Sequence, residues 1–302
     1  MKLTRYQFEF LAFLEKYGEQ DYKLRNISDS LLISDSEIEK CIRLMSDIGL
    51  IKKDGTRLDI TEKGLKALEP YRVKRAVIMA AGFGERMLPA TLECPKPMVK
   101  VNGVRIIDTL IGALIKADVK DITIVRGYKK EAFNEIQKKY SFVNFIDNDF
   151  YDKANNIFSC VLALDKIDSC YLCEADLYIY NPDIIKKYQY CSNILGSFSL
   201  ETDDWCFKMD EKGYATDFRK GNTYCYNEYG ISFWTKEDSE KLRNDYFTVY
   251  NEFENGQNYF WDYIPLVLFK DRYNVEIRQC QKSDIIEIDS YHELGLLDPS
   301  YK

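Results

Sequence analysis

The alternation of strand-like and helix-like runs after residue 75 constrains the fold of this chain more than any other feature. Short apolar runs with the length of buried strands are separated by stretches in which apolar residues recur at helical spacing. The predicted strands are residues 76–81, 122–125, 142–146 and 170–174, and the predicted helices between them are residues 104–117, 131–140 and 156–164. This order predicts a Rossmann-like α/β fold, in which helices cover a mostly parallel mixed sheet and ligands bind at the carboxyl ends of its strands.

The first 70 residues have a different pattern, in which helices come first and a hairpin follows. Apolar residues recur at helical spacing in residues 4–17 and 34–48. Residues 50–60 are two apolar segments around an Asp-Gly turn, which is the pattern of a β-hairpin. Pro70 disfavours continuation of a helix, and a new periodicity begins after it. The expected domains are residues 1–70 and residues 74–302.

The order of helices and hairpin resembles the winged helix-turn-helix domains of bacterial transcription regulators. A helix that enters the major groove of DNA should carry an excess of Lys and Arg. The predicted helix of residues 34–48 instead carries four acidic and two basic residues: Asp35, Glu37, Glu39, Asp47, Lys40 and Arg43. We interpret this small domain as a module for dimerisation, regulation or packing. Lys52, Lys53 and Arg57 in the hairpin keep DNA binding as the alternative.

Composition indicates a folded protein that acts on small molecules. Of the 302 residues 46% are hydrophobic and 30% are charged, and the net charge of −7 disfavours attraction to nucleic acid or anionic lipid. The sequence has neither an apolar run of membrane-spanning length nor a secretion signal, so we expect a cytoplasmic protein without a membrane partner. Nine scattered cysteines are typical of reduced thiols. Composition leaves the oligomeric state open.

The segment after the first predicted strand carries the strongest sign of chemistry. Gly82 and Gly84 follow that strand directly and let backbone N–H groups come close to an anion or a base edge. A P-loop needs Gly-Lys followed by Ser or Thr, and a dinucleotide fingerprint needs a third glycine where Met87 stands, so both motifs fail. What remains is a glycine loop with two cations nearby, Arg86 and Lys96, which suit the oxygens of a triphosphate.

This segment resembles the signature of the sugar-1-phosphate and alcohol-phosphate nucleotidyltransferases. Over most of residues 74–293 the chain is most similar to the bacterial CTP:phosphocholine cytidylyltransferases. The resemblance rests on an ordered set of short stretches, residues 80–86, 95–96, 127–128, 155–159, 174–176, 230–234, 261–262 and 287–290. The chain departs from relatives at Pro97-Met98, where they often have Ala-Leu, and in its added N-terminal domain. The resemblance implies synthesis of CDP-choline and pyrophosphate from CTP and phosphocholine.

The resemblance also implies roles for single residues. The implied nucleotide-binding residues are Ala80, Ala81, Gly82, Gly84 and Asn156. Arg86 and Lys96 would stabilise the charge that develops on pyrophosphate. The family's metal aspartate falls at Asp176 and a second donor is expected at Asp262, so these two catalytic residues would hold Mg²⁺. A general base is not required, because a phosphomonoester is largely dianionic at neutral pH.

Three tryptophans are candidates for binding the choline group. Trimethylammonium cannot donate a conventional hydrogen bond, so it is recognised by aromatic faces near a carboxylate. Trp205, Trp234 and Trp261 all lie beyond the glycine loop, and two of them adjoin aspartates. Packing in the core is the competing interpretation of each ring.

Several alternatives stay open at this point. The acceptor could be phosphoethanolamine, 2-aminoethylphosphonate or a sugar phosphate, and a primary ammonium group would favour more carboxylates and fewer rings. The chain could also be a winged-helix regulator that only senses nucleotide. Related chains sometimes continue into a choline-kinase-like domain, and a fused or partner domain of that kind is compatible with the end of this sequence. Cys170 and Cys173 lack further zinc ligands, and His292 lacks a nucleophile partner.

Overall fold

The computed structural model describes residues 2–18, 20–21 and 23–302, and the chain divides into two compact units. The first unit is Met1–Arg72 with Tyr188–Tyr190, and the second is Val73–Lys187 with Cys191–Lys302. The division lies two residues beyond the predicted end of the first domain. The sequence did not predict that Tyr188–Tyr190 belong to the first unit. Within that unit the Tyr190 ring stacks on the ring of Tyr71, with centroids 5.6 Å apart.

The first unit combines helices with a small sheet in which the strand order is β1-β3-β2. Its elements are α1 (Arg5–Tyr17), β1 (Gln20–Asp21), α2 (Leu24–Leu31), α3 (Asp35–Asp47), β2 (Ile51–Asp54), β3 (Arg57–Ile60) and α4 (Glu62–Leu68). Thr4 and Ser34 cap α1 and α3 by accepting backbone N–H groups of the first turn. The predicted helices and hairpin are confirmed, and the winged-helix interpretation stays a prediction.

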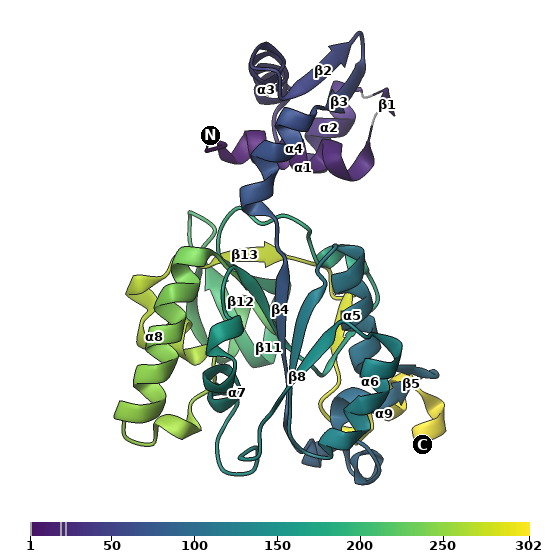
Figure 1. Cartoon of the computed structure of the whole chain (residues 1–302), viewed down its shortest axis with the longest axis vertical. Coiled ribbons are helices and arrows are strands. Elements are labelled where there is room, and N and C mark those ends of the chain that lie inside the picture. The colour runs from purple at the N-terminus through teal and green to yellow at the C-terminus, as the bar shows by residue number, and fades with distance from the viewer. Residues whose placement is uncertain (1, 19, 22) are drawn as a thin grey trace. The chain divides into compact units, whose positions relative to one another are not determined.

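The second unit is built on a seven-stranded sheet with the order β13-β11-β12-β9-β4-β7-β8 (Figure 1). Its strands are β4 (Arg75–Ala80), β7 (Asp121–Arg126), β8 (Val143–Asp147), β9 (Cys170–Glu174), β11 (Asn193–Met209), β12 (Ala215–Trp234) and β13 (Glu276–Gln279). Strands β9, β4, β7 and β8 are parallel to one another, β11 is parallel to β13, and β12 is antiparallel to β9 and β11. The mostly parallel sheet is therefore confirmed.

Helices pack on both faces of this sheet. The remaining elements are α5 (Ile106–Lys116), α6 (Asn134–Lys139), α7 (Ile157–Leu162), α8 (Lys236–Glu252), α9 (Tyr291–Leu297), β5 (Lys100–Val101), β6 (Val104–Arg105), β10 (Leu177–Ile179) and β14 (Ile285–Glu287). Ala76 and Ile78 of β4 belong to the core under α5, whereas Val77 and Met79 belong to the core under α7 and α8. Alternate residues of a strand point to opposite faces, so this central strand is buried on both sides.

The antiparallel strands β11 and β12 form a long hairpin that curls back on itself. Tyr226 lies opposite both Phe198 and Phe207, and Asn227 lies opposite both Ser197 and Cys206. The outer part of β11 therefore returns to pair with the free edge of β12. Shifts in the strand register accompany this bend, as expected where bulges increase the local twist.

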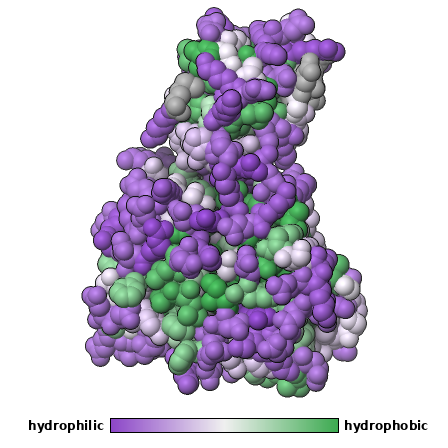
Figure 2. Space-filling model, viewed as in Figure 1, coloured by the Kyte–Doolittle hydropathy of each residue, from purple (hydrophilic) through white to green (hydrophobic). Residues whose placement is uncertain are grey.

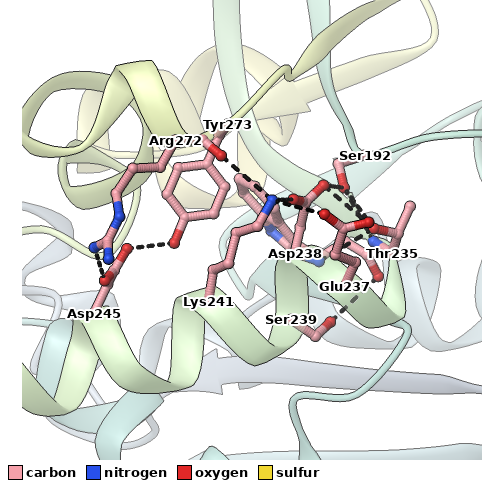
Figure 3. Close-up of polar contacts among 10 residues, drawn as sticks. Ser192, Thr235, Glu237, Asp238, Ser239, Lys241, Asp245, Arg272 and Tyr273 are labelled. Atoms are coloured by element: carbon pink, nitrogen blue, oxygen red, sulfur yellow. Dashed lines mark hydrogen bonds and ion pairs between the residues drawn. The ribbon is translucent and has the colours of Figure 1, made fainter.

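A polar network fixes helix α8 to the segments around it (Figure 3). Thr235 caps the helix, and Lys241 donates to Asp238 over 2.9 Å. About one turn further along α8, the carboxylate of Asp245 accepts a hydrogen bond from the hydroxyl of Tyr273 and forms an ion pair with Arg272. These groups satisfy one another's hydrogen bonds and charges, so we assign them a structural role.

Hydrophilic residues cover most of the visible surface, with apolar residues gathered over part of the second unit (Figure 2). In the described part of the chain, every helix is too short or too polar to cross a membrane.

Candidate active site

The glycine loop begins where β4 ends, at the carboxyl edge of the parallel strands. Ala80 is the last residue of β4, and the backbone of Gly84 is left-handed with a φ of +71°. A side chain on Gly84 would place its Cβ 2.9 Å from the Cβ of Lys96. The Thr91 hydroxyl donates to the Gly84 carbonyl over 3.0 Å and so holds the glycine loop against the residues that follow it. A glycine is therefore required where the loop passes Lys96.

Two cations meet one carboxylate beside this loop. The ammonium of Lys96 lies 2.7 Å from Oδ2 of Asp176 and 2.6 Å from Oδ1 of Asp289. The guanidinium of Arg86 lies 2.9 Å from Oδ2 of Asp289. Lys96 is 11% exposed and Arg86 is 72% exposed, so the lysine lies deep in the site and the arginine at its rim.

Pairing of two short strands brings distant acidic residues together. Glu174 ends β9 and Asp176 follows it, and antiparallel pairing of β10 with β14 sets Leu177 opposite Glu287. The backbone N–H of Ile288 donates to the carbonyl of Asp176 over 3.1 Å. Carboxylate oxygens of Glu174, Asp176 and Glu287 consequently lie within 4.8 Å of one another.

Burial and mutual repulsion set the protonation of this cluster. Burial, followed by the nearby carboxylates of Asp176 and Asp262, raises the pKa of Glu174 to about 8. Burial alone would raise the pKa of Asp289, but Lys96 and Arg86 outweigh it and hold this pKa below its usual value. Burial would likewise lower the pKa of Lys96, but the two aspartates outweigh it and raise this pKa. Lys96 and Asp289 are therefore charged at neutral pH.

A second set of contacts ties the start of α7 to the acidic cluster. Side-chain N–H groups of Asn156 and Trp261 both donate to Oε1 of Glu174 over 3.0 Å. The backbone N–H of Trp261 donates to Oδ1 of Asn156 over 2.9 Å. Asp262 follows, is 8% exposed, and burial raises its pKa to about 6. The segments around Asn156 and Trp261, which are distant in the sequence, thus both lie at the carboxyl end of β9.

Comparison with known proteins assigns this arrangement to a family. A profile of the family described as nucleotidyl transferase matches residues 75–162. A 2-aminoethylphosphonate cytidylyltransferase of Lancefieldella rimae is 35% identical over 229 residues, which cover 75% of this chain and 92% of that protein. This chain is a cytidylyltransferase of the nucleotidyl transferase family.

Two further relatives agree with this assignment. A choline-phosphate cytidylyltransferase of Haemophilus influenzae is 27% identical to this cytidylyltransferase, over 74% of this chain and 98% of that protein. The solved structure of a CTP:phosphocholine cytidylyltransferase from Streptococcus pneumoniae has a TM-score of 0.70 and 28% identity, and it covers 76% of this chain and 100% of that one. The second unit therefore has the fold of the family.

The structure brings together most of the charged residues that the sequence analysis singled out. In this cytidylyltransferase Arg86 and Lys96 share Asp289, and Lys96 also contacts Asp176. The carboxylate of Asp262 acts on the same cluster by raising the pKa of Glu174. Of the other implied nucleotide-binding residues, Ala80 and Ala81 are buried at the start of the loop, Gly82 and Gly84 lie in it, and Asn156 bonds Glu174.

Two of the three tryptophans are too buried to bind a substrate, and the binding role of Trp205 stays a prediction. Trp234 has no exposed surface, and its indole N–H donates to Ser232 over 2.7 Å within the core. Trp261 is also fully buried, with its indole N–H directed to Glu174. Trp205 is half-buried and stacks on Phe218 with centroids 5.0 Å apart. Trp234 is therefore a core residue, because its place at the end of β12 directs it into the packed layer under α8.

Two acidic residues of this site were missed as site residues in the sequence. Glu287 and Asp289 lie two positions apart at the end of a short strand, as do Glu174 and Asp176. This repeated spacing of Glu, one residue and Asp is the signal that could have found them, because residues two apart in a strand share one face.

Proposed function

We propose that this enzyme transfers the cytidylyl group of CTP to a small phosphonate or phosphate that carries a primary ammonium group, with 2-aminoethylphosphonate as the favoured acceptor. The observation that carries the proposal is the single site in which Lys96 and Arg86 face a cluster of carboxylates at the end of the parallel strands. The 35% identity to a relative named for this acceptor supports the same choice.

The character of the site supports a primary ammonium over a quaternary one. A quaternary ammonium needs aromatic faces, and two of the three tryptophans are fully buried. A primary ammonium is favoured by surroundings rich in hydrogen-bond acceptors, and Glu174, Asp176 and Glu287 give this site that character. This supports the alternative that the sequence analysis set against phosphocholine.

The donor set fits Mg²⁺, which prefers carboxylate oxygens. Oδ1 of Asp176 is buried and has no hydrogen-bond partner among the described residues. The ammonium of Lys96 contacts Asp176 and Asp289 at once, which marks a point that both carboxylates reach. We infer that Asp176 and Asp289 hold the ion, with Glu287 beside them, in place of the pair Asp176 and Asp262 expected from the sequence. A bound Mg²⁺ would neutralise charge on the α-phosphate during transfer.

The residues of the chain position and neutralise the reactants. Phosphate oxygens of CTP replace Asp289 as partners of Arg86 and Lys96, which then stabilise the charge of the departing pyrophosphate. An oxygen of the acceptor forms a bond to the α-phosphorus while the bond from that phosphorus to pyrophosphate breaks, and pyrophosphate leaves with the electron pair. The acceptor oxygen is already anionic, so no residue has to remove a proton from it.

Release of pyrophosphate from CTP in the presence of Mg²⁺ tests the proposal. The acceptors to compare are 2-aminoethylphosphonate, phosphoethanolamine, phosphocholine and glucose 1-phosphate. We expect the highest kcat/KM with 2-aminoethylphosphonate, and a lower rate when UTP, ATP or GTP replaces CTP. Binding of CTP without pyrophosphate release for every acceptor would contradict the proposal and favour a nucleotide sensor.

Phosphocholine is the second candidate acceptor, because two of the similar proteins carry its name. A higher kcat/KM with phosphocholine than with 2-aminoethylphosphonate in the same assay would establish it instead.

A further inference from the structure

A cavity of about 270 Å³ lies beside the acidic cluster, and the mechanism described so far does not use it. Its wall comes from the long hairpin and from β14 with the turn before it. The lining residues are Asp204, Asn227, Glu228, Tyr229, Lys282, Ile285, Ile286 and Glu287. Glu287 also belongs to the carboxylate group around Asp176, so the cavity adjoins the place where we put the reacting phosphates.

The charged lining of this cavity is mainly acidic. Asp204, Glu228 and Glu287 face one cation, Lys282, whose ammonium donates to the hydroxyl of Ser199 over 2.9 Å. Burial, and then the carboxylates of Asp262, Glu174 and Glu287, raise the pKa of Glu228 well above its usual value. An ionised Glu228 is costly without a counter-charge, and a cationic ligand would remove that cost.

Acceptors outnumber donors among the charged side chains that line this cavity, because three carboxylates stand against one ammonium. Glu228 accepts the backbone N–H of Gly230 through Oε1. Tyr229 is the one aromatic residue of the lining, and its hydroxyl is bonded to Ser197 over 2.8 Å. Such a lining suits three N–H donors better than methyl groups.

We propose that Glu228 forms the subsite that binds the primary ammonium group of the acceptor and so determines acceptor specificity. The subsite rests on the proposed function, because it takes its ligand from the acceptor class named there. Glu228 supplies both the negative charge and an oxygen acceptor, which a methyl group in place of the ammonium would leave unpaired. The phosphonate end of the same molecule then points to the cluster through the shared residue Glu287.

Binding measurements test the subsite without requiring turnover. Isothermal titration compares 2-aminoethylphosphonate with propylphosphonate, which replaces the ammonium by methyl, in the presence of Mg²⁺ and a non-reactive CTP analogue. We expect the wild type to prefer the amino ligand and Glu228→Gln to reduce this preference roughly 10- to 100-fold. Glutamine keeps an acceptor for the N–H of Gly230, so the fold should be retained.

Glu201→Gln is the matched control, because Glu201 is an exposed carboxylate of the same hairpin outside the cavity lining. It should keep the wild-type preference. Equal binding of both ligands by the wild type, or an unchanged preference in Glu228→Gln, would overturn the subsite.

Kinetics separates the subsite from the proposed function. If the amino preference depends on Glu228 but no acceptor yields pyrophosphate, the subsite stands and the proposed function fails. If 2-aminoethylphosphonate is cytidylylated and its KM is unchanged in Glu228→Gln, the proposed function stands and the subsite fails.

Discussion

At the scale of single residues, the site depends on a balance between few cations and many carboxylates. Lys96 is the buried cation of this balance, and its two partners are the residues that we infer to hold the metal ion. A partner of a buried ion pair matters most when it is removed alone, because the other charge is then left without compensation. Because Lys96 has two partners, it stays paired when either one is substituted, so single substitutions of these partners separate catalysis from folding.

Replacement of Asp176 by alanine should abolish most of the activity and leave the fold intact. Lys96 keeps its contact with Asp289, so it remains paired. We expect kcat/KM in Mg²⁺ to fall by at least about 10²–10³, with an unchanged circular dichroism spectrum. Asp121→Ala is the control, because Asp121 lies at the amino end of β7 and pairs with Arg75 there. A rate for Asp176→Ala near that of the control would refute the assignment.

Asp262 should make stability depend on pH in a defined window. Burial raises the pKa of Asp262 from 3.8 to about 6, so the folded protein favours the neutral carboxyl group. Folding therefore gains stability from this group at low pH, and that gain is lost as the pH rises from about 4 through about 6. Asparagine stays neutral and retains the acceptor for the N–H of Tyr263. The Tm of Asp262→Asn, measured without Mg²⁺, should equal that of the wild type near pH 4 and exceed it by a few degrees near pH 7. A constant difference at every pH would count against this account.

At the scale of elements, the glycine loop and the pairing of β10 with β14 build the site. The loop allows the chain to pass close to Lys96, and the strand pair brings residues from near the end of the chain to the carboxyl end of β9. The first of these features is local in the sequence and the second is not.

Gly84→Ala should impair activity through backbone geometry. The left-handed backbone disfavours a side chain by roughly 1–2 kcal/mol, and the new Cβ would displace Lys96. We expect a loss of roughly 10- to 100-fold in kcat/KM. Gly112→Ala in α5 is the control, because nothing lies within 4 Å of its added Cβ and alanine stabilises a helix by about 0.5–1 kcal/mol. Equal activity of the two variants would contradict the assigned role of the loop.

The sequence predicted those parts of the fold and site that depend on local patterns. The strand at residues 170–174 has the predicted bounds, and the glycine loop lies where apolar periodicity and turn chemistry placed it. Asp289 was missed because its contact with Lys96 spans 193 positions and depends on strand pairing. Trp234 was placed at a substrate site because its sequence neighbours do not reveal which face of β12 is buried.

At the scale of the whole molecule, two units of different character share one acidic chain. The net charge is −7, and both basic residues of α3 form ion pairs within that helix, Lys40 with Glu37 and Arg43 with Glu39. Because both cations of α3 are paired within the helix, α3 has little positive charge left to bind the phosphates of DNA.

The full chain should therefore not retard duplex DNA of random sequence. The measurement is an electrophoretic shift at about 50 mM salt, where non-specific binding is strong. The expected result is free DNA at every protein concentration tested. A retarded band that disappears as salt is added would show that the hairpin cations, not the acidic helix, dominate the first unit.

Identification of the product by ³¹P nuclear magnetic resonance tests the central claim most directly. The full chain is incubated with CTP, Mg²⁺ and 2-aminoethylphosphonate. The account predicts that signals of CTP decline while those of pyrophosphate and of a phosphonate joined to the α-phosphate of CMP grow in equal amounts. Unchanged CTP, or pyrophosphate formed without a phosphonate-linked CMP, would contradict it.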